Sequence, residues 1–187
     1  MSGSPAVAVD GILGPVDPDT PKLLMPLARA LRSINQAMVF AGMVALLVAA
    51  VVLTSSVVTR YLLKASTDWQ DEAAVFCLVG ATFMCSAFVQ ALRGHVGIEA
   101  LAGVLPPLAN RLRLTAVDLL CLLFCTFFAW KSWTLFHEAW SEGQTTSSSW
   151  APPLWIPYSL MAAGMSLLAL QLVLQLTATC KRLMRRS

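Results

Sequence analysis

The chain has 187 residues, of which 57% are hydrophobic and only 12% charged, and its formal net charge is +3. Soluble domains carry about 25% charged residues, so this composition excludes an ordinary soluble enzyme or binding module and indicates a membrane protein. We expect the lipid bilayer as its main surrounding and no nucleic acid as a partner.

The start of the chain differs in kind from the rest. Residues 1–22 contain three Asp, four Pro and three Gly, and they lack the basic start and short apolar core of a secretory signal. We therefore predict a disordered tail over residues 1–25. The segment that follows has apolar residues on one side and Arg29 and Arg32 on the other, which favours a short amphipathic helix at the membrane interface.

Two long uncharged segments come next. Twenty-seven residues without a charge lie between Arg32 and Arg60, and twenty lie between Glu72 and Arg93. A spanning helix needs roughly 20 residues to cross a hydrocarbon core of about 30 Å. Both segments are therefore predicted to span the membrane.

The second half of the chain repeats this pattern. Residues 114–130 hold one acid, Asp118, and the segment from about 153 to 180 has no charge. We predict an all-α membrane protein with four transmembrane helices in one domain, residues 26–180, followed by a basic tail, residues 181–187.

Basic residues fix the expected orientation. Ten of the thirteen Lys and Arg lie before the first span, between the second and third, or after the fourth, and the other three are Arg60, Lys64 and Lys131. The positive-inside rule then places both termini and the central loop in the cytoplasm. The segments 61–71 and 131–152 are expected on the outer side.

The second span begins with a cluster of acids. Asp68 suits a helix N-cap, and Asp71 and Glu72 fall in the first turn, where the helix dipole favours negative charge by roughly 0.3–1 kcal/mol each. Trp69 suits the aromatic belt at the membrane surface. A capped helix start explains these residues, and a ligand-binding role is the open alternative. Adjacent acids point about 100° apart on a helix, which argues against a catalytic pair.

The first two spans form an antiparallel hairpin in this interpretation. Arg60 and Tyr61 end the first span at the outer interface, and the hairpin brings Arg60 near Asp71 and Glu72. At the rim of the lipid an ion pair is worth more than in water. We therefore predict an ion pair between Arg60 and these acids.

The central loop contains an apolar stretch that stops at Pro106 and Pro107 and is predicted to form a short helix on the inner membrane surface. Arg93, His95 and Glu99 would hold the corner where the second span meets this helix through charge-assisted hydrogen bonds. A solvated polar turn is the open alternative.

Asp118 is the acid inside a predicted span. Because it follows Arg113 by five residues, it lies roughly 7 Å inside the cytoplasmic boundary at 1.5 Å per residue. A local ion pair or a contact with another subunit fits this depth better than a proton or sodium relay.

Three tryptophans recur at helical spacing beyond the third span, at Trp130, Trp133 and Trp140. Interface anchoring explains them, with a binding platform for an aromatic ligand as the alternative. We expect the third helix to project past the bilayer, with residues 141–153 as a loop.

The histidines and cysteines point to no cofactor or metal. A haem held between helices needs ligands that meet at one iron, whereas His95 and His137 fall in loops on opposite sides of the membrane. A quinone-coupled disulfide oxidase needs cysteine pairs in its outer loops. The cysteines instead lie within spans or at the inner end of the last one, at Cys77, Cys85, Cys121, Cys125 and Cys180.

The order of these motifs resembles the small membrane subunit, DctQ type, of tripartite ATP-independent periplasmic (TRAP) transporters. Arg-Tyr ends the first span, Trp-x-Asp-Glu opens the second, "ALRGHVGIEAL" follows it, and "PLWIPYSLMAAGMSLLALQL" carries the last span. The resemblance covers about residues 30–180. The matching positions are Arg60, Tyr61, Trp69, Asp71, Glu72, Arg93, His95, Glu99, Pro153, Trp155, Tyr158 and Gly164.

This resemblance implies a non-catalytic subunit of the bacterial inner membrane. Its partners would be a large membrane subunit, which carries the solute and the coupling cation, and a periplasmic substrate-binding protein, which delivers an organic acid. The expected subunit contacts and structural positions are the matching residues from Arg60 to Glu99, together with Asp118, Trp155 and Tyr158. A membrane anchor for a respiratory oxidoreductase is the main alternative, and a free-standing small transporter is another.

Overall fold

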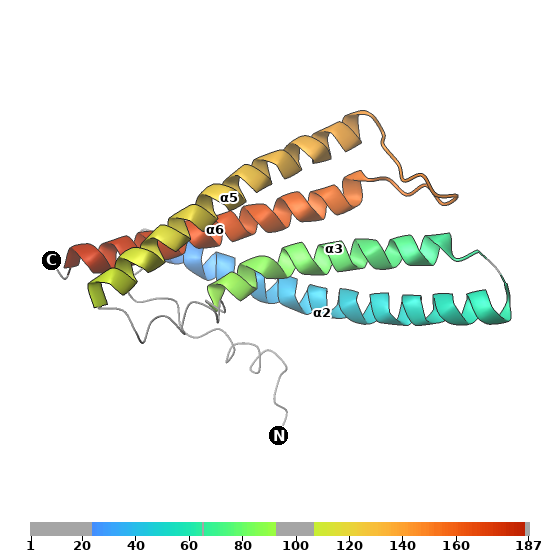
Figure 1. Ribbon diagram of the computed structural model, residues 1–187, viewed down its shortest axis with the longest axis horizontal. Coiled ribbons are helices and arrows are strands. Elements are labelled where there is room, and N and C mark those ends of the chain that lie inside the picture. Colours follow the sequence, from blue (N-terminus) through green and yellow to red (C-terminus); the bar gives the residue numbers. More distant parts are fainter. Residues whose placement is uncertain (1–23, 65, 93–106, 186–187) are drawn as a thin grey trace, which may run out of the picture.

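The computed structural model describes residues 24–64, 66–92 and 107–185, and these residues form four long helices (Figure 1). The helices are α2 (Met25–Leu62), α3 (Asp68–Ala91), α5 (Pro107–Ser141) and α6 (Trp155–Arg185). The prediction of an all-α protein is confirmed for the described residues, whose only β feature is one isolated bridge between Thr145 and Pro153.

Each helix contains a segment that is long and apolar enough to cross a membrane. The third and fourth of these segments are Thr115–Ser141 and Trp155–Thr179. The prediction of four spans is therefore confirmed. The predicted tail over residues 1–25 lies almost wholly outside the described residues, and so does the predicted inner-surface helix before Pro107. Helix α6 continues to Arg185, past the predicted end of the membrane domain at residue 180.

Helix α2 differs from its prediction at its start. The amphipathic segment with Arg29 and Arg32 does not form a separate surface helix, because α2 runs without a break from Met25 to Leu62. Its 38 residues correspond to about 57 Å at 1.5 Å per residue, which is longer than a hydrocarbon core of about 30 Å. Leu31, in this first part, is 1% exposed and packs inside the protein.

The four helices form a single layer in the order α2, α3, α6, α5. Helix α3 packs against α2 on one side and α6 on the other, α5 packs against α6, and α2 touches α6 only marginally. Figure 1 shows this order at the end of the layer where the two loops lie. We call this the outer end, following the predicted orientation; the inner end carries the start of α5 and the end of α6. The layer therefore consists of two hairpins, α2–α3 and α5–α6.

Helices α2 and α3 pack through two antiparallel series of seven-residue spacing. The buried positions are Asn35, Gly42, Ala49 and Ser56 on α2, and Thr67, Ala74, Ala81 and Phe88 at the start of α3 and along it. Gly42 lies against the backbone of Ala81, where an added Cβ would be 3.7 Å from the Cα. A period of seven keeps one seam facing the partner helix. Small residues in that seam let the two backbones approach closely, as is common in membranes.

Helices α3 and α6 run in the same direction and join the two hairpins. Gly164 of α6 lies directly on the backbone of Phe83, so that an added Cβ would overlap the carbonyl group of that residue. Farther out, Gly80 of α3 faces Leu160, with 3.0 Å between an added Cβ and the leucine Cδ1. The joint is therefore close enough to require glycine at Gly164.

A buried apolar cluster lies between α5 and α6. Cys125 and Ala129 of α5 meet Met165 and Leu172 of α6 in a buried cluster. Phe83 of α3 extends this cluster, and its ring stacks on that of Phe128 with 6.2 Å between centroids. Packing therefore continues from the α2–α3 seam across the whole layer.

Candidate functional site

The outer corner of the α2–α3 hairpin carries a polar network built on Arg60. Its Nη2 donates to Asp71 Oδ2 at 2.8 Å and to Thr67 Oγ1 at 2.7 Å. Ser56 Oγ donates to the other carboxylate oxygen of Asp71 at 3.0 Å. Two side chains of α2 therefore bind one acid of α3, and Thr67 in the turn accepts a second bond from the same arginine. The predicted ion pair of Arg60 is confirmed with Asp71.

The two neighbouring acids do not take the roles predicted for them. Glu72 is not a partner of Arg60: it is half buried, and its Oε2 is buried without a hydrogen-bond partner. On a helix Glu72 points about 100° away from Asp71. The N-cap is Thr67 rather than Asp68, since the Thr67 carbonyl accepts the amide hydrogens of Gln70 and Asp71 at 3.0 and 3.2 Å.

Asp68 binds the α5–α6 loop instead of capping its own helix. Ser149 Oγ donates to Asp68 Oδ2 at 2.7 Å, across 81 residues of sequence. Next to this bond the rings of Trp69 and Trp150 meet edge to face, with centroids 6.5 Å apart. The loop therefore connects the two hairpins at the outer end.

The other residues that carry the family resemblance lie either on the surface or where two helices pack together. Tyr61 is 80% exposed at the end of α2, as an interface anchor would be. Trp155, the first residue of α6, packs edge to face on Trp140 of α5 at 5.1 Å between centroids. Tyr158 is half buried one turn farther along α6. Arg93, His95 and Glu99 lie outside the described residues.

Asp118 lies near the inner end of α5, three residues into the span that begins at Thr115, and is half buried. The prediction of a local or intersubunit contact in place of an ion relay stays a prediction.

The aromatic residues beyond the third span lie on one continuous helix, because α5 extends to Ser141 as predicted. Trp133 Nε1 donates to Ser166 Oγ of α6 at 3.0 Å. The Lys131 ammonium sits over the ring of Trp130, 5.2 Å from its centroid. The first contact ties α5 to α6, and the second lies within α5. Interface anchoring of these tryptophans stays a prediction.

Sequence reasoning missed the neutral polar residues inside the spans. Gln90 Nε2 donates to Gln175 Oε1 at 2.8 Å, and Gln175 Nε2 returns a bond to the Gln90 carbonyl at 2.8 Å. Asn35 is 1% exposed, and neither of its side-chain polar atoms has a partner. An amide inside an apolar span is the signal that could have identified all three, since such groups are costly to bury and usually bond across helices.

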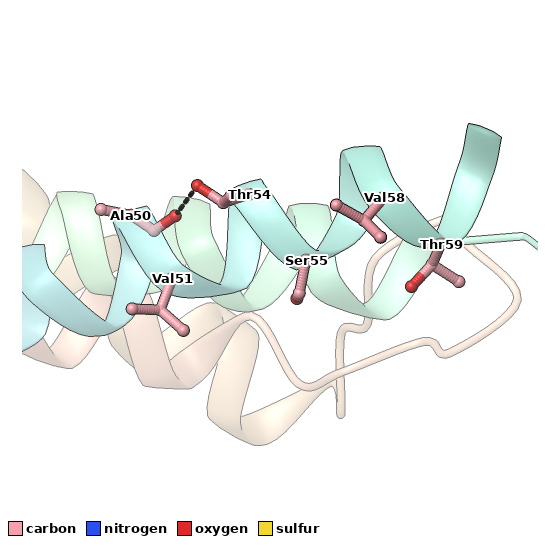
Figure 2. Close-up of a pocket in the computed structure, with 6 residues that line it drawn as sticks. All are labelled: Ala50, Val51, Thr54, Ser55, Val58 and Thr59. Carbon is pink, nitrogen blue, oxygen red and sulfur yellow. Dashed lines mark hydrogen bonds between the residues drawn. The ribbon is translucent and has the colours of Figure 1, made fainter. Parts of the chain in front are cut away.

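Helix α2 leaves one face open at the edge of the layer. A groove of about 520 Å³ lies on this face. Figure 2 shows its lining residues, among them Thr54, whose hydroxyl donates to the Ala50 carbonyl; this bond is 2.8 Å long. A second groove, of about 350 Å³, lies where α2 and α6 flank α3 near Gly42, Gly80 and Leu160. Both grooves are mainly apolar and suit lipid chains or another membrane helix.

The described residues contain no group of three or more His, Cys, Asp or Glu that could hold a metal ion. His137 is exposed on α5, and the cysteines described as free, Cys77, Cys85, Cys121 and Cys125, all lie within helices.

A family model described as "Tripartite ATP-independent periplasmic transporters, DctQ component" matches residues 49–182. The match covers more than half of the chain, from the middle of α2 to near the end of α6. Neither a curated protein nor a solved structure matches the chain. The family consists of transporter components rather than enzymes. The chain therefore belongs to the DctQ family and is a small membrane subunit of a TRAP transporter.

Proposed function

We propose that this subunit braces the large membrane subunit of its transporter during ion-gradient-driven uptake of an organic acid that a periplasmic binding protein delivers. Family membership supports an association with other TRAP components. The organic-acid class and the bacterial inner membrane are taken from the family resemblance.

The observation that supports the proposed bracing role is the arrangement of the helices in a single layer. Among the described helices, α2 packs on α3, α3 on α6 and α6 on α5, and α2 touches α6 only marginally. Carriers build their solute sites from broken helices around a cavity near the bilayer midplane. Here the described helices are continuous, and the buried amide of Gln90 bonds to the half-buried amide of Gln175. Such a layer suits a support against which another subunit moves.

The external partner would meet the outer end of the layer. Arg60 and Asp71 fix the α2–α3 corner, and the α5–α6 loop lies beside it with Trp69 and Trp150 half exposed. These residues belong to two hairpins yet form one rim. A rigid rim of this kind suits the docking of a soluble binding protein.

The proposal is tested by reconstitution in liposomes. A carboxylic acid that thermally stabilises the binding protein is first identified from a panel and then radiolabelled. The chain alone should move none of it under any ion gradient, whereas the chain, the large subunit and the loaded binding protein together should take it up without ATP. Gradient-driven uptake by the chain alone would make it a carrier. Full uptake by the large subunit and binding protein without this chain would refute the brace.

A further inference from the structure

The two hairpins of the layer meet through one joint, between α3 and α6. In the part of the chain that the structure describes, α2 touches α6 only marginally, and α5 packs mainly on α6. Whether the layer behaves as one body or bends at its centre therefore depends on what holds this joint.

The inner end of the joint is held by the two amides. Gln90 and Gln175 exchange two hydrogen bonds of 2.8 Å, one between side chains and one to a backbone carbonyl. Gln90 is buried, with 7% of its surface exposed. Opening the joint here would break both of these hydrogen bonds in apolar surroundings, which is costly.

The outer end is held by the α5–α6 loop, which passes the start of α6 to reach α3. Figure 1 shows the loop extending from the end of α5 toward the outer end of α3. Ser149 donates to Asp68 at 2.7 Å, and Trp150 packs edge to face on Trp69. These two contacts join residues of different hairpins.

The loop is also held by hydrogen bonds within itself. Thr146 N–H donates to the Pro152 carbonyl at 3.1 Å, and Leu154 N–H donates to the Gln144 carbonyl at 2.9 Å. Ala151 has a φ of 47°, a left-handed conformation uncommon outside glycine, and its N–H donates to the Ser148 carbonyl at 3.2 Å. A loop ordered in this way loses little conformational entropy when it binds α3.

We propose that residues 142–154 form a strap that closes the outer end of the α3–α6 joint and stays closed throughout transport. Together with the two hydrogen bonds between Gln90 and Gln175 at the inner end, the strap makes the two hairpins one rigid body. The transport part of this inference rests on the proposed function. The closure of the strap does not.

The test uses the full chain with Asp68→Cys and Ser149→Cys, treated with a short bis-methanethiosulfonate cross-linker that dithiothreitol cleaves. The pair should cross-link rapidly in membranes, in the chain alone and in the assembled transporter. Each single cysteine variant reports any reaction with the native thiols. The matched control is Asp68→Cys with Ser141→Cys, because Ser141 ends α5, whose main packing partner is α6 and not α3.

Uptake is then measured in the reconstituted complex before cross-linking, after it, and after reduction. If the strap stays closed, the cross-linked complex transports at an unchanged rate. Loss of uptake on cross-linking, with recovery on reduction, would show that the strap must open and would overturn the inference. Cross-linking no faster than in the Ser141 control would overturn it as well. A complex without uptake in any form would refute the proposed function, while the cross-linking rate of the chain alone would still decide whether the strap is closed.

Discussion

Replacing Gly164 with alanine tests the close approach of α6 to α3. The new Cβ would overlap the carbonyl oxygen and carbon of Phe83 and would lie 2.9 Å from its Cβ. Ordinary contacts between carbon atoms are about 3.5–4.0 Å, so α6 must move away by about 1 Å at this point. The clashing atoms belong to the backbone and cannot rotate aside.

The expected cost follows from two opposing terms. Overpacking a well-packed site costs about 1–3 kcal/mol, and a backbone clash belongs at the upper end of that range. Alanine in a helix interior is favoured over glycine by about 0.8–1.0 kcal/mol. Gly164→Ala should therefore lose about 2 kcal/mol of stability, the balance of these two terms.

Gly80→Ala is the matched control on the other side of the same joint. Its Cβ would lie 3.0 Å from Leu160 Cδ1, the far end of a flexible and half-buried side chain. A rotamer adjustment costs about 0.5–1.5 kcal/mol and roughly cancels the gain in helix propensity. This variant should be close to neutral.

The assay is unfolding of the purified chain in detergent micelles by added dodecyl sulfate, followed by the fluorescence of its six tryptophans. Gly164→Ala should unfold at a clearly lower fraction of dodecyl sulfate than either the native chain or Gly80→Ala. Equal stability of the two variants, or a larger loss for Gly80→Ala, would refute the close parallel packing of α3 and α6.

Three further predictions concern named polar groups. A double-mutant cycle with Arg60→Ala and Asp71→Ala should give a coupling free energy of only about 0.2–1 kcal/mol, because the two side chains are 61% and 46% exposed. Strictly additive losses of stability would exclude the ion pair. Gln175→Leu should lower the free energy of unfolding in dodecyl sulfate by about 1–3 kcal/mol, because it removes the Gln175 partner of Gln90. Replacing both glutamines with leucine should cost less than that single change. The reverse order would contradict the hydrogen bonding between the two amides. Asp118→Asn removes a charge but keeps the shape of the side chain, so it should lower assembly with the large subunit, measured by co-purification. The ion-to-solute ratio of uptake should stay unchanged. An altered ratio would place Asp118 in the translocation machinery.

The sequence alone determined which segments enter the membrane. The cost of placing charges and open backbone groups in lipid is so large that an uncharged apolar segment of sufficient length must span as a helix. It also predicted the Arg60–Asp71 contact, because the two residues flank a short turn that forces their helices to be neighbours. The role of Glu72 was wrong because adjacent helix positions face different neighbours, and only the packing shows which of them faces α2.

The order of the helices and the contacts between the hairpins were decided only by the tertiary structure. In a soluble helix the apolar stripe identifies the packed face, but these spans are apolar on all sides, and lipid is as apolar as a neighbouring helix. Hydrophobicity therefore did not indicate that α3 packs parallel to α6, that Gly164 sits on the backbone of Phe83, or that Gln90 meets Gln175. Ser149 and Asp68 are 81 residues apart, and their contact exists because the α3–α6 pairing brings the two outer ends together.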